Sequence, residues 1–276
     1  MKLSELLKDL TVIKTNMDLN TEIAGVTYDS RKVQPGYLFV AVTGYATDGN
    51  LYIPMALGKG AVAVVTAKEQ TEDVPYVQVR SDREALARIG ANLYGHPGEA
   101  MQVIAVTGTN GKTTTTTLVG EIMKAHFADV FVVGNIGNPY TLEVSKTGEA
   151  SVTVAEISSF QLETTDTFHP TVSAILNITP DHLNRHHTME NYVKAKEAVA
   201  EKQTKEEVCV LNYEDAYLRD FAERCPAKVL FFASGHKLED GYYLEGDYIF
   251  RAKAGKSERI LNVHEDMRLV GICNIE

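Results

Sequence analysis

The chain has 276 residues, of which 44% are hydrophobic and 23% charged, a composition typical of a water-soluble protein with one large or two ordinary domains. Its formal net charge of −10 argues against a nucleic-acid-binding surface, although local basic clusters around anionic ligands remain compatible with it. No apolar stretch reaches the ~18 residues that a membrane span needs, and the acidic start Met1–Glu5 is unlike a secretory signal. Three cysteines without metal-like spacing indicate reduced thiols, so we expect a cytoplasmic protein.

The first 98 residues predict a small α/β domain. Strands are expected at 23–28, 37–42, 60–65 and 76–79, and helices at 51–57 and 82–94. Ser81 is a suitable N-cap for the second of these helices, because its hydroxyl can accept a hydrogen bond from the first turn. The run Gly95-His96-Pro97-Gly98 interrupts the pattern, so we place a domain boundary there.

A loop of small residues follows a predicted strand at 101–106 and precedes a predicted helix at 118–127. From Val106 it reads Val-Thr-Gly-Thr-Asn-Gly-Lys-Thr-Thr. Backbone N–H groups in such a turn can surround a phosphate, and the helix N-terminus adds partial positive charge. Lys112 can then reach the β- and γ-phosphates, and the Thr113 hydroxyl can hold Mg²⁺. The strict phosphate-loop pattern has Gly in place of Val106, yet the flanking strand and helix predict a nucleoside-triphosphate site.

The remaining residues alternate strands and helices. Strands are expected at 130–133, 151–156, 172–177 and 208–211, with a helix at 190–201. These short β-branched runs are typical of parallel strands that are buried on both faces. After residue 228 the pattern becomes β-rich, and Glu245–Tyr248 is a hairpin turn signal. The predicted fold class is therefore α/β, with a mostly parallel, phosphate-loop ATPase-like sheet and an added β-rich part.

Three predicted strands end in polar segments that include Asn135, Glu156 and His182. Ligands of α/β sheets gather at the carboxyl ends of strands, and a carboxylate and an imidazole beside a phosphate loop are suitable Mg²⁺ ligands. Taken alone, Glu156 is equally compatible with a solvated strand-end acid, and His182 with a surface or capping histidine.

His182 and His186 are four residues apart, which also raises the possibility of zinc. The His-Glu-x-x-His arrangement fails, because Leu183 occupies the position of the general base. Phosphate and Mg²⁺ chemistry therefore explains His182 better than zinc does. Taken alone, Lys196 would be an ordinary surface lysine.

Five short segments, in the order in which a known enzyme family has them, resemble that family. They span residues 107–114, 134–137, 156–163, 177–183 and 192–196. Together they resemble the Mur ligases, ATP-dependent enzymes that add amino acids to UDP-N-acetylmuramic acid. The Gly-Asn-Ile-Gly and Ser-Ser-Phe-Gln-Leu-Glu forms are most similar to the ligase that adds D-glutamate. Residues 28–36, Tyr-Asp-Ser-Arg-Lys-Val-Gln-Pro-Gly, and the segment 186–192 are instead similar to the ligase that adds the third residue, diaminopimelate or lysine.

The resemblance implies an ATP-dependent, amide-forming ligase of peptidoglycan precursor synthesis that acts through an acyl phosphate. D-Glutamate is the favoured amino acid, and the third-residue ligase is the alternative. Folylpolyglutamate synthetase shares the phosphate loop, but the segment Asp29-Ser30-Arg31 argues against it. A nucleotide-dependent binding or regulatory protein on the same fold is a more remote alternative, which UDP-sugar binding would distinguish.

The resemblance also implies individual roles. ATP would be held by Gly108, Thr109, Asn110, Gly111, Lys112, Thr113, Thr114 and, at the adenine, Asn274. Mg²⁺ would be held by Thr113, Glu156, His182 and a carbamylated Lys196, and the last three would act in catalysis with Lys112. The channel for the UDP-muramoyl substrate would be lined by Asn135, Ser158, Ser159 and Gln161, with Ser30 at the uridine end. Carbamylation would give Lys196 an anionic group that a metal ion does not repel.

The implied domain plan has a UDP-sugar-binding domain over 1–98, an ATP-binding domain over 99–276 and an amino-acid-binding domain after residue 276. We expect the end at Asn274-Ile275-Glu276, which lacks a Pro or Gly closure, to be an interruption. The chain is expected to be a monomer with a UDP-N-acetylmuramoyl substrate and a free amino acid as partners. By itself it is expected to be inactive in ligation.

Overall fold

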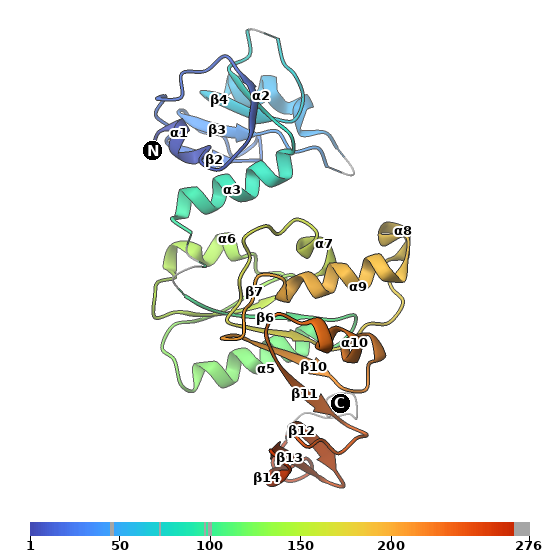
Figure 1. Ribbon diagram of the computed structural model, residues 1–276. Coiled ribbons are helices and arrows are strands. Elements are labelled where there is room, and N and C mark those ends of the chain that lie inside the picture. The colour runs from blue at the N-terminus through green and yellow to red at the C-terminus, as the bar shows by residue number, and fades with distance from the viewer. Residues whose placement is uncertain (45–46, 72, 97, 99–100, 268–276) are drawn as a thin grey trace. The chain divides into compact units, whose positions relative to one another are not determined.

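The structure is a computed structural model that describes residues 1–44, 47–71, 73–96, 98 and 101–267. The chain divides into two compact units, Met1–His96 and Pro97–Glu276 (Figure 1). The division falls within the run Gly95–Gly98 that interrupts the sequence pattern. Which unit binds which ligand stays a prediction.

The first unit is built around a five-stranded sheet with the order β1-β5-β4-β3-β2. Its strands are β1 (Val12–Thr15), β2 (Gly25–Thr27), β3 (Tyr37–Val40), β4 (Ala63–Thr66) and β5 (Tyr76–Val79). Only the pairing of β1 with β5 is antiparallel among these described strands. The helices are α1 (Leu3–Leu6), α2 (Ile53–Gly58) and α3 (Asp82–Tyr94), with a 3-10 turn at Gly49–Tyr52.

Apolar residues of this unit form two clusters. Leu3, Leu6 and Ile89 of α1 and α3 pack in one cluster, and Ile53 and Ala56 of α2 pack in the other. The strands and helices predicted between residues 23 and 94 are confirmed, and the Ser81 hydroxyl accepts a hydrogen bond from the N–H of Glu84. Strand β1 was not predicted, because its two inner residues are both exposed and its two outer residues are partly exposed, so it lacks a period-two alternation.

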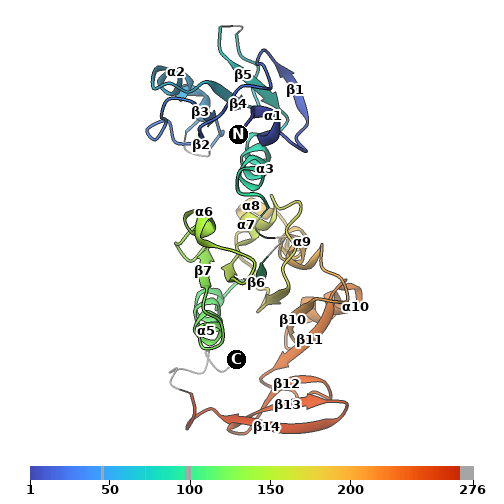
Figure 2. The ribbon, with the colours of Figure 1, turned by 90° about the vertical axis from the view of Figure 1, so that its left-hand side faces the viewer.

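The second unit contains a nine-stranded sheet with the order β14-β13-β12-β11-β10-β9-β6-β8-β7. Its strands are β6 (Gln102–Thr107), β7 (Val130–Gly134), β8 (Val152–Glu156), β9 (Val172–Ile175), β10 (Val208–Asn212), β11 (Lys228–Ala233), β12 (Gly241–Glu245), β13 (Tyr248–Lys253) and β14 (Lys256–Asn262). The strands from β7 to β12 are parallel, and β12, β13 and β14 pair antiparallel. Figure 2 shows these last three strands at one end of the sheet. The predicted hairpin turn joins β12 to β13.

Helices cover both faces of the parallel part. They are α5 (Lys112–Lys124), α6 (Tyr140–Glu143), α7 (Ser159–Leu162), α8 (Leu183–His186), α9 (Met189–Glu197) and α10 (Ala216–Arg224), with 3-10 turns at Val144–Lys146 and Ala198–Ala200. Figure 1 shows α5 on the opposite face of the sheet from α6 and α9. Residues of α7, α9 and α10, among them Leu162, Tyr192 and Phe221, share one apolar cluster with the strands.

Helix α5 begins at Lys112, six residues before the predicted start, so the run of threonines is helical. Threonine has a low intrinsic helix propensity, and here packing of α5 against β7 and β8 overrides it.

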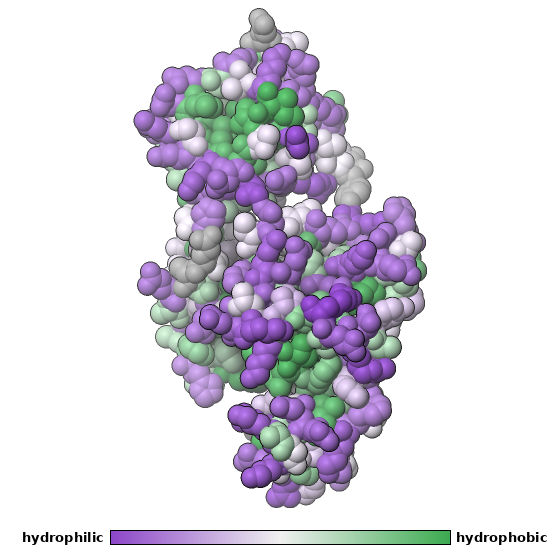
Figure 3. Space-filling model, in the orientation of Figure 1, coloured by the Kyte–Doolittle hydropathy of each residue, from purple (hydrophilic) through white to green (hydrophobic). Residues whose placement is uncertain are grey.

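The described surface is mainly polar. Figure 3 shows hydrophilic residues over most of the drawn face, with apolar residues in separate areas. Within the described ranges, none of the helices has both the length and the apolar character needed to span a lipid bilayer.

Candidate functional site

The loop between β6 and α5 borders a cavity of about 330 Å³, which is lined by Thr109–Thr114, Asn135 and Glu156. Gly111 precedes α5 with a φ of +79°, a left-handed conformation that glycine adopts without steric cost. No side chain caps this end of α5, and the N–H groups of the first helical turn have no partner within the helix. The loop therefore offers backbone donors and a helix N-terminus to an anion, as predicted for a phosphate site.

Two lysines converge on this loop. Lys112 Nζ donates to Gly108 O at 3.0 Å and to Thr109 O at 2.8 Å, and Lys196 Nζ donates to the same Gly108 O at 2.7 Å. Lys196 is only 2% exposed. Burial and the neighbouring Lys112 lower the pKa of Lys196 to about 7, against an opposing effect of Asp181. A substantial fraction of this amine is therefore neutral, and nucleophilic, near neutral pH.

Glu156 is the centre of a second group. Its Oε2 accepts a hydrogen bond from Thr113 Oγ1 at 2.8 Å, and its Oε1 accepts one from Asn135 Nδ2 at 2.8 Å. The turn after β7 wraps closely around it, since a Cβ on Gly134 would lie 2.2 Å from Glu156 O. A hydroxyl and a carboxylate at one cavity edge fit Mg²⁺, which takes one or two protein oxygens together with waters and phosphate oxygens.

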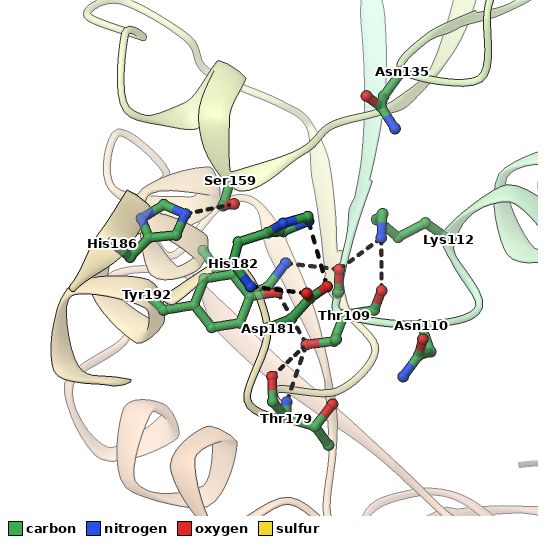
Figure 4. Close-up of polar contacts among 12 residues, drawn as sticks. Thr109, Asn110, Lys112, Asn135, Ser159, Thr179, Asp181, His182, His186 and Tyr192 are labelled. Carbon is green, nitrogen blue, oxygen red and sulfur yellow. Dashed lines mark hydrogen bonds and ion pairs between the residues drawn. The ribbon is translucent and has the colours of Figure 1, made fainter. Parts of the chain in front are cut away.

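A third segment, between β9 and α8, forms hydrogen bonds with the loop that precedes α5 (Figure 4). Asn177 Oδ1 accepts from the N–H groups of Thr109 and Asn110 at 3.1 and 2.8 Å. Thr109 Oγ1 donates to Thr179 O at 3.2 Å and lies 3.1 Å from Tyr192 Oη. Sequence reasoning assigned no role to Asn177, although a polar residue at the carboxyl end of a strand is the signal that singled out Glu156.

His182 lies at the end of this third segment, where it precedes α8. Its side chain is 49% exposed, and its Nε2 lies 3.4 Å from Asp181 Oδ2. No hydrogen bond joins His182 or Lys196 to Thr113 or Glu156 within the described part of the chain. The structure thus groups Lys112 with Lys196 and Thr113 with Glu156, whereas the contacts of His182 are with Asp181 and Phe160.

Among the described residues, neither His182 nor His186 belongs to a cluster of possible metal ligands. In the described ranges, no three His, Cys, Asp or Glu side chains are grouped as metal ligands. His186 is instead bonded to Ser159 and Glu163, at 3.0 Å in each case.

Three residues expected to line a substrate channel lie at the start of α7 and have side-chain partners there or in α8. Ser158 and Gln161 form a reciprocal cap, in which Gln161 Oε1 accepts from Ser158 N at 2.9 Å. Ser159 is 2% exposed, and its hydroxyl faces His186. In this conformation Ser159 does not line an open channel, because its side chain is covered.

Two further predicted site residues lie elsewhere. Ser30 belongs to the first unit and is buried next to Asp29, whose carboxylate accepts from Arg31 Nε at 2.9 Å. This contact with Arg31 lowers the pKa of Asp29 to about 2. Asn274 lies outside the described residues.

Comparison with known proteins identifies similarity along most of the chain. Residues 106–276 match the family model described as "Mur ligase middle domain", and residues 22–105 match "Mur ligase family, catalytic domain". The UDP-N-acetylmuramoylalanine--D-glutamate ligase of Lachnospira eligens is 60% identical over 175 residues, 63% of this chain and 39% of that protein. The same-named protein of Desulfitobacterium hafniense strain DCB-2 is 39% identical over 234 residues, 83% of this chain and 51% of that protein. The chain thus spans about half the length of these relatives, or less.

Solved structures support the fold. A UDP-N-acetylmuramoyl-L-alanyl-D-glutamate--2,6-diaminopimelate ligase superposes with a TM-score of 0.73 at 24% identity, covering 100% of this chain and 61% of that one. MurF ligase of Thermotoga maritima in complex with ADP superposes with a TM-score of 0.62 at 23% identity, covering 88% and 58%. The alignment of 83% with the D. hafniense protein is longer than the second unit, so it includes part of the first unit as well.

Proposed function

Because this chain belongs to the Mur ligase family, we propose that its second unit binds ATP with Mg²⁺ and that the whole protein adds D-glutamate to UDP-N-acetylmuramoyl-L-alanine. The observation that carries the nucleotide assignment is the Thr113–Glu156 pair, which shares one cavity with the loop that precedes α5. The names of the relatives at 60% and 39% identity support the choice of D-glutamate.

The proposed reaction has two steps. The substrate carboxylate attacks the γ-phosphorus of ATP and ADP leaves, and the amine of the amino acid then attacks the acyl carbon and phosphate leaves. Lys112 and the N–H groups at the start of α5 would bind the phosphates, while Thr113 and Glu156 would hold Mg²⁺. Bound Mg²⁺ would neutralise charge that develops on the transferred phosphoryl group. The site would therefore act by positioning the reactants and by neutralising charge on the phosphates.

Substitution of Lys112 tests the nucleotide assignment. Lys112→Ala should weaken MgATP binding by ~2 kcal/mol or more, about thirtyfold, because a charge-assisted contact to phosphate is lost. The measurement is calorimetric titration of the 276-residue chain. Lys124→Ala, at the other end of α5 and paired with Glu121, is the matched control and should bind as the wild type does. Equal affinity of wild type and Lys112→Ala would refute the assignment.

We also propose that Lys196 is carbamylated when CO₂ is present. Its neutral amine would attack the carbon of CO₂ and release one proton, which leaves a carbamate anion beside the loop. The support is the pKa of about 7 together with burial, since a protonated amine is not nucleophilic. The carbamate would then extend the set of oxygen ligands near His182.

¹³C NMR in labelled bicarbonate at mildly alkaline pH tests this modification. The wild type and Lys194→Ala, which alters an exposed lysine of the same helix, should show a carbamate signal. Lys196→Ala should show none. A spectrum of the wild type without the signal would contradict the proposal.

The third-residue ligase is the second candidate, and the segment 28–36 of the first unit favours it. The two acceptors are distinguished by assaying the whole protein with D-glutamate and with diaminopimelate or lysine, each with its own UDP-muramoyl substrate. Amide formation with D-glutamate alone supports the first candidate. Residues Ser30, Asn135, Ser158 and Gln161 remain the proposed contacts of the UDP-muramoyl substrate.

A further inference from the structure

His186 is buried at the end of α8 and links that helix to α7. Its Nε2 lies 3.0 Å from Ser159 Oγ, and its Nδ1 lies 3.0 Å from Glu163 Oε1. A neutral imidazole satisfies both partners, because Nδ1–H donates to the carboxylate while Nε2 accepts from the hydroxyl. The order Ser-His-Glu is that of a hydrolase triad, but Ser159 is 2% exposed and its hydroxyl cannot meet a substrate. The arrangement is therefore structural rather than nucleophilic.

Rings and charges surround this imidazole. Phe160 stacks on it with centroids 5.6 Å apart, and the Tyr192 ring lies at 5.1 Å. Arg185 Nη2 donates to Glu163 Oε2 at 2.6 Å and so holds the carboxylate in place. Charged or titratable groups around His186 are Glu163, Arg185, His182, Lys196 and the Tyr192 phenol. Burial lowers the pKa of His186, which agrees with the neutral form that its two contacts require.

Both ends of α8 have strained backbones. His182 precedes the helix with a φ of +51°, and His187 follows it with a φ of +68°. Residues with a Cβ are unfavourable in this region, and such conformations persist only where the surroundings enforce them. Contacts that hold α8 here are the His186 side chain and the Arg185 guanidinium, which both bond to residues of α7 or its C-cap, and Asn191 Nδ2, which donates to His186 O at 2.9 Å.

The Phe160 ring extends the connection to His182. Its centroid lies 4.8 Å from the His182 ring and 5.6 Å from the His186 ring, so one phenyl group contacts both imidazoles. His182 in turn ends the segment whose Asn177 and Thr179 contact the phosphate loop. Figure 4 shows His186 and Ser159 pointing toward each other, with His182 on the side of the loop.

We propose that His186 is a positioning residue, which ties α8 to α7 and thereby keeps His182 in its left-handed conformation at the phosphate loop. As far as it concerns Mg²⁺, this inference rests on the proposed MgATP site. His186 itself touches neither nucleotide nor metal in this assignment. Its effect is on the orientation of His182.

The test uses the ¹⁵N,¹³C-labelled 276-residue chain and two readouts. Backbone chemical shifts of His182, recorded without ligand, report whether its φ stays positive. Calorimetry with a non-hydrolysable ATP analogue, in Mg²⁺ and in EDTA, reports the affinity that depends on the metal. His186→Leu removes both polar contacts, Ser159→Ala removes one hydroxyl, and His186→Gln keeps a polar group near the position of Nε2. His187→Asn changes the adjacent exposed histidine and keeps a residue that tolerates positive φ, so it is the matched control.

In the wild type and His187→Asn, we expect left-handed shifts at His182 and an affinity that increases with Mg²⁺. In His186→Leu, the shifts should move to the right-handed or extended range, and the Mg²⁺-dependent gain should fall at least tenfold while affinity in EDTA is unchanged. Ser159→Ala should show the same changes more weakly, and His186→Gln should restore part of both.

The inference is overturned if Ser159→Ala and His186→Leu keep wild-type shifts at His182. If His186→Leu does not fold, Ser159→Ala decides, because it removes a single buried hydroxyl. If the affinity of the wild type does not depend on Mg²⁺, the proposed function is refuted instead. The backbone chemical shifts of His182, recorded without ligand, would still test the role of His186.

Discussion

At the scale of single residues, Lys196 has an environment with a consequence for stability. Its folded-state pKa of about 7 is below the ordinary value of 10.5, so the unfolded chain binds more protons between these two values. Stability should therefore increase as pH rises from 7 toward 10.5, by up to ~1.4 kcal/mol per pH unit. Below pH 7 the full penalty of burying the ammonium is present.

Denaturant unfolding in CO₂-free buffer across this pH range measures the effect. Lys196→Met should reduce the slope, since methionine cannot titrate, whereas Lys194→Met should keep it. A wild type whose stability changes with pH no more than that of Lys196→Met would contradict the burial of a titrating amine.

Single residues also show how far the sequence predicts the site. Lys112, Thr113 and Glu156 meet at one cavity as expected, because the phosphate-loop spacing and the strand-end rule both act through backbone topology. The contact of Ser159 with His186 could not be predicted, since it joins residues 27 apart through side-chain packing. Spacing along the chain does not contain that information.

At the scale of elements, the turn after β7 holds Glu156 through a close backbone approach. A Cβ on Gly134 would lie 2.2 Å from Glu156 O, and Gly134 has a φ of +99°. Gly137 has a similar φ of +94°, but a Cβ there meets nothing within 4 Å. The two glycines thus separate the effect of conformation from the effect of collision.

Gly137→Ala should destabilise the protein by about 1–2 kcal/mol, from backbone strain alone. Gly134→Ala should lose a further 1–3 kcal/mol or so, because the collision shifts the turn or β8. Chemical unfolding of both variants, followed by MgATP titration, checks this, and Gly134→Ala should also weaken nucleotide binding. Equal stabilities for the two variants would show that the turn can relax.

The elements differ in how well the sequence predicts them. Parallel strands such as β4 and β8 are recognised by their short β-branched runs, which burial on both faces requires. The start of α5 is placed too late, because intrinsic propensity disfavours threonine and the stabilising contacts come from β7 and β8. The short helix α10 was not predicted, although Asp215 caps it by accepting from the N–H of Tyr217 at 2.9 Å.

At the scale of the whole molecule, the two units have separate apolar cores, so we expect two unfolding transitions in calorimetry. Ile89→Ala should lower the midpoint of the first unit, and Leu211→Ala that of the second, by the loss of buried contacts. MgATP at a hundredfold excess over its Kd should stabilise only the second unit, by ~2.7 kcal/mol.

A single transition that both substitutions shift equally would contradict independent units. UDP that raises only the first transition would support the proposal that the first unit binds the uridine end of the substrate. If UDP raises the second transition alone, the proposed role of the first unit in UDP binding is wrong.

The antiparallel strands β12–β14 have a consequence for self-association. Strand β11 contains Val229-Leu230-Phe231-Phe232, an apolar β-forming run of the kind that pairs with other chains when its edge is open. Strand β12 pairs with the last two residues of β11, Phe232 and Ala233. The described sheet then ends at β14, whose residues Lys256–Ile260 are exposed and include three charges. Charged edge strands resist addition of a further strand. Strands β12–β14 therefore protect the carboxyl end of β11 and present a charged strand at this end of the sheet, which disfavours self-association.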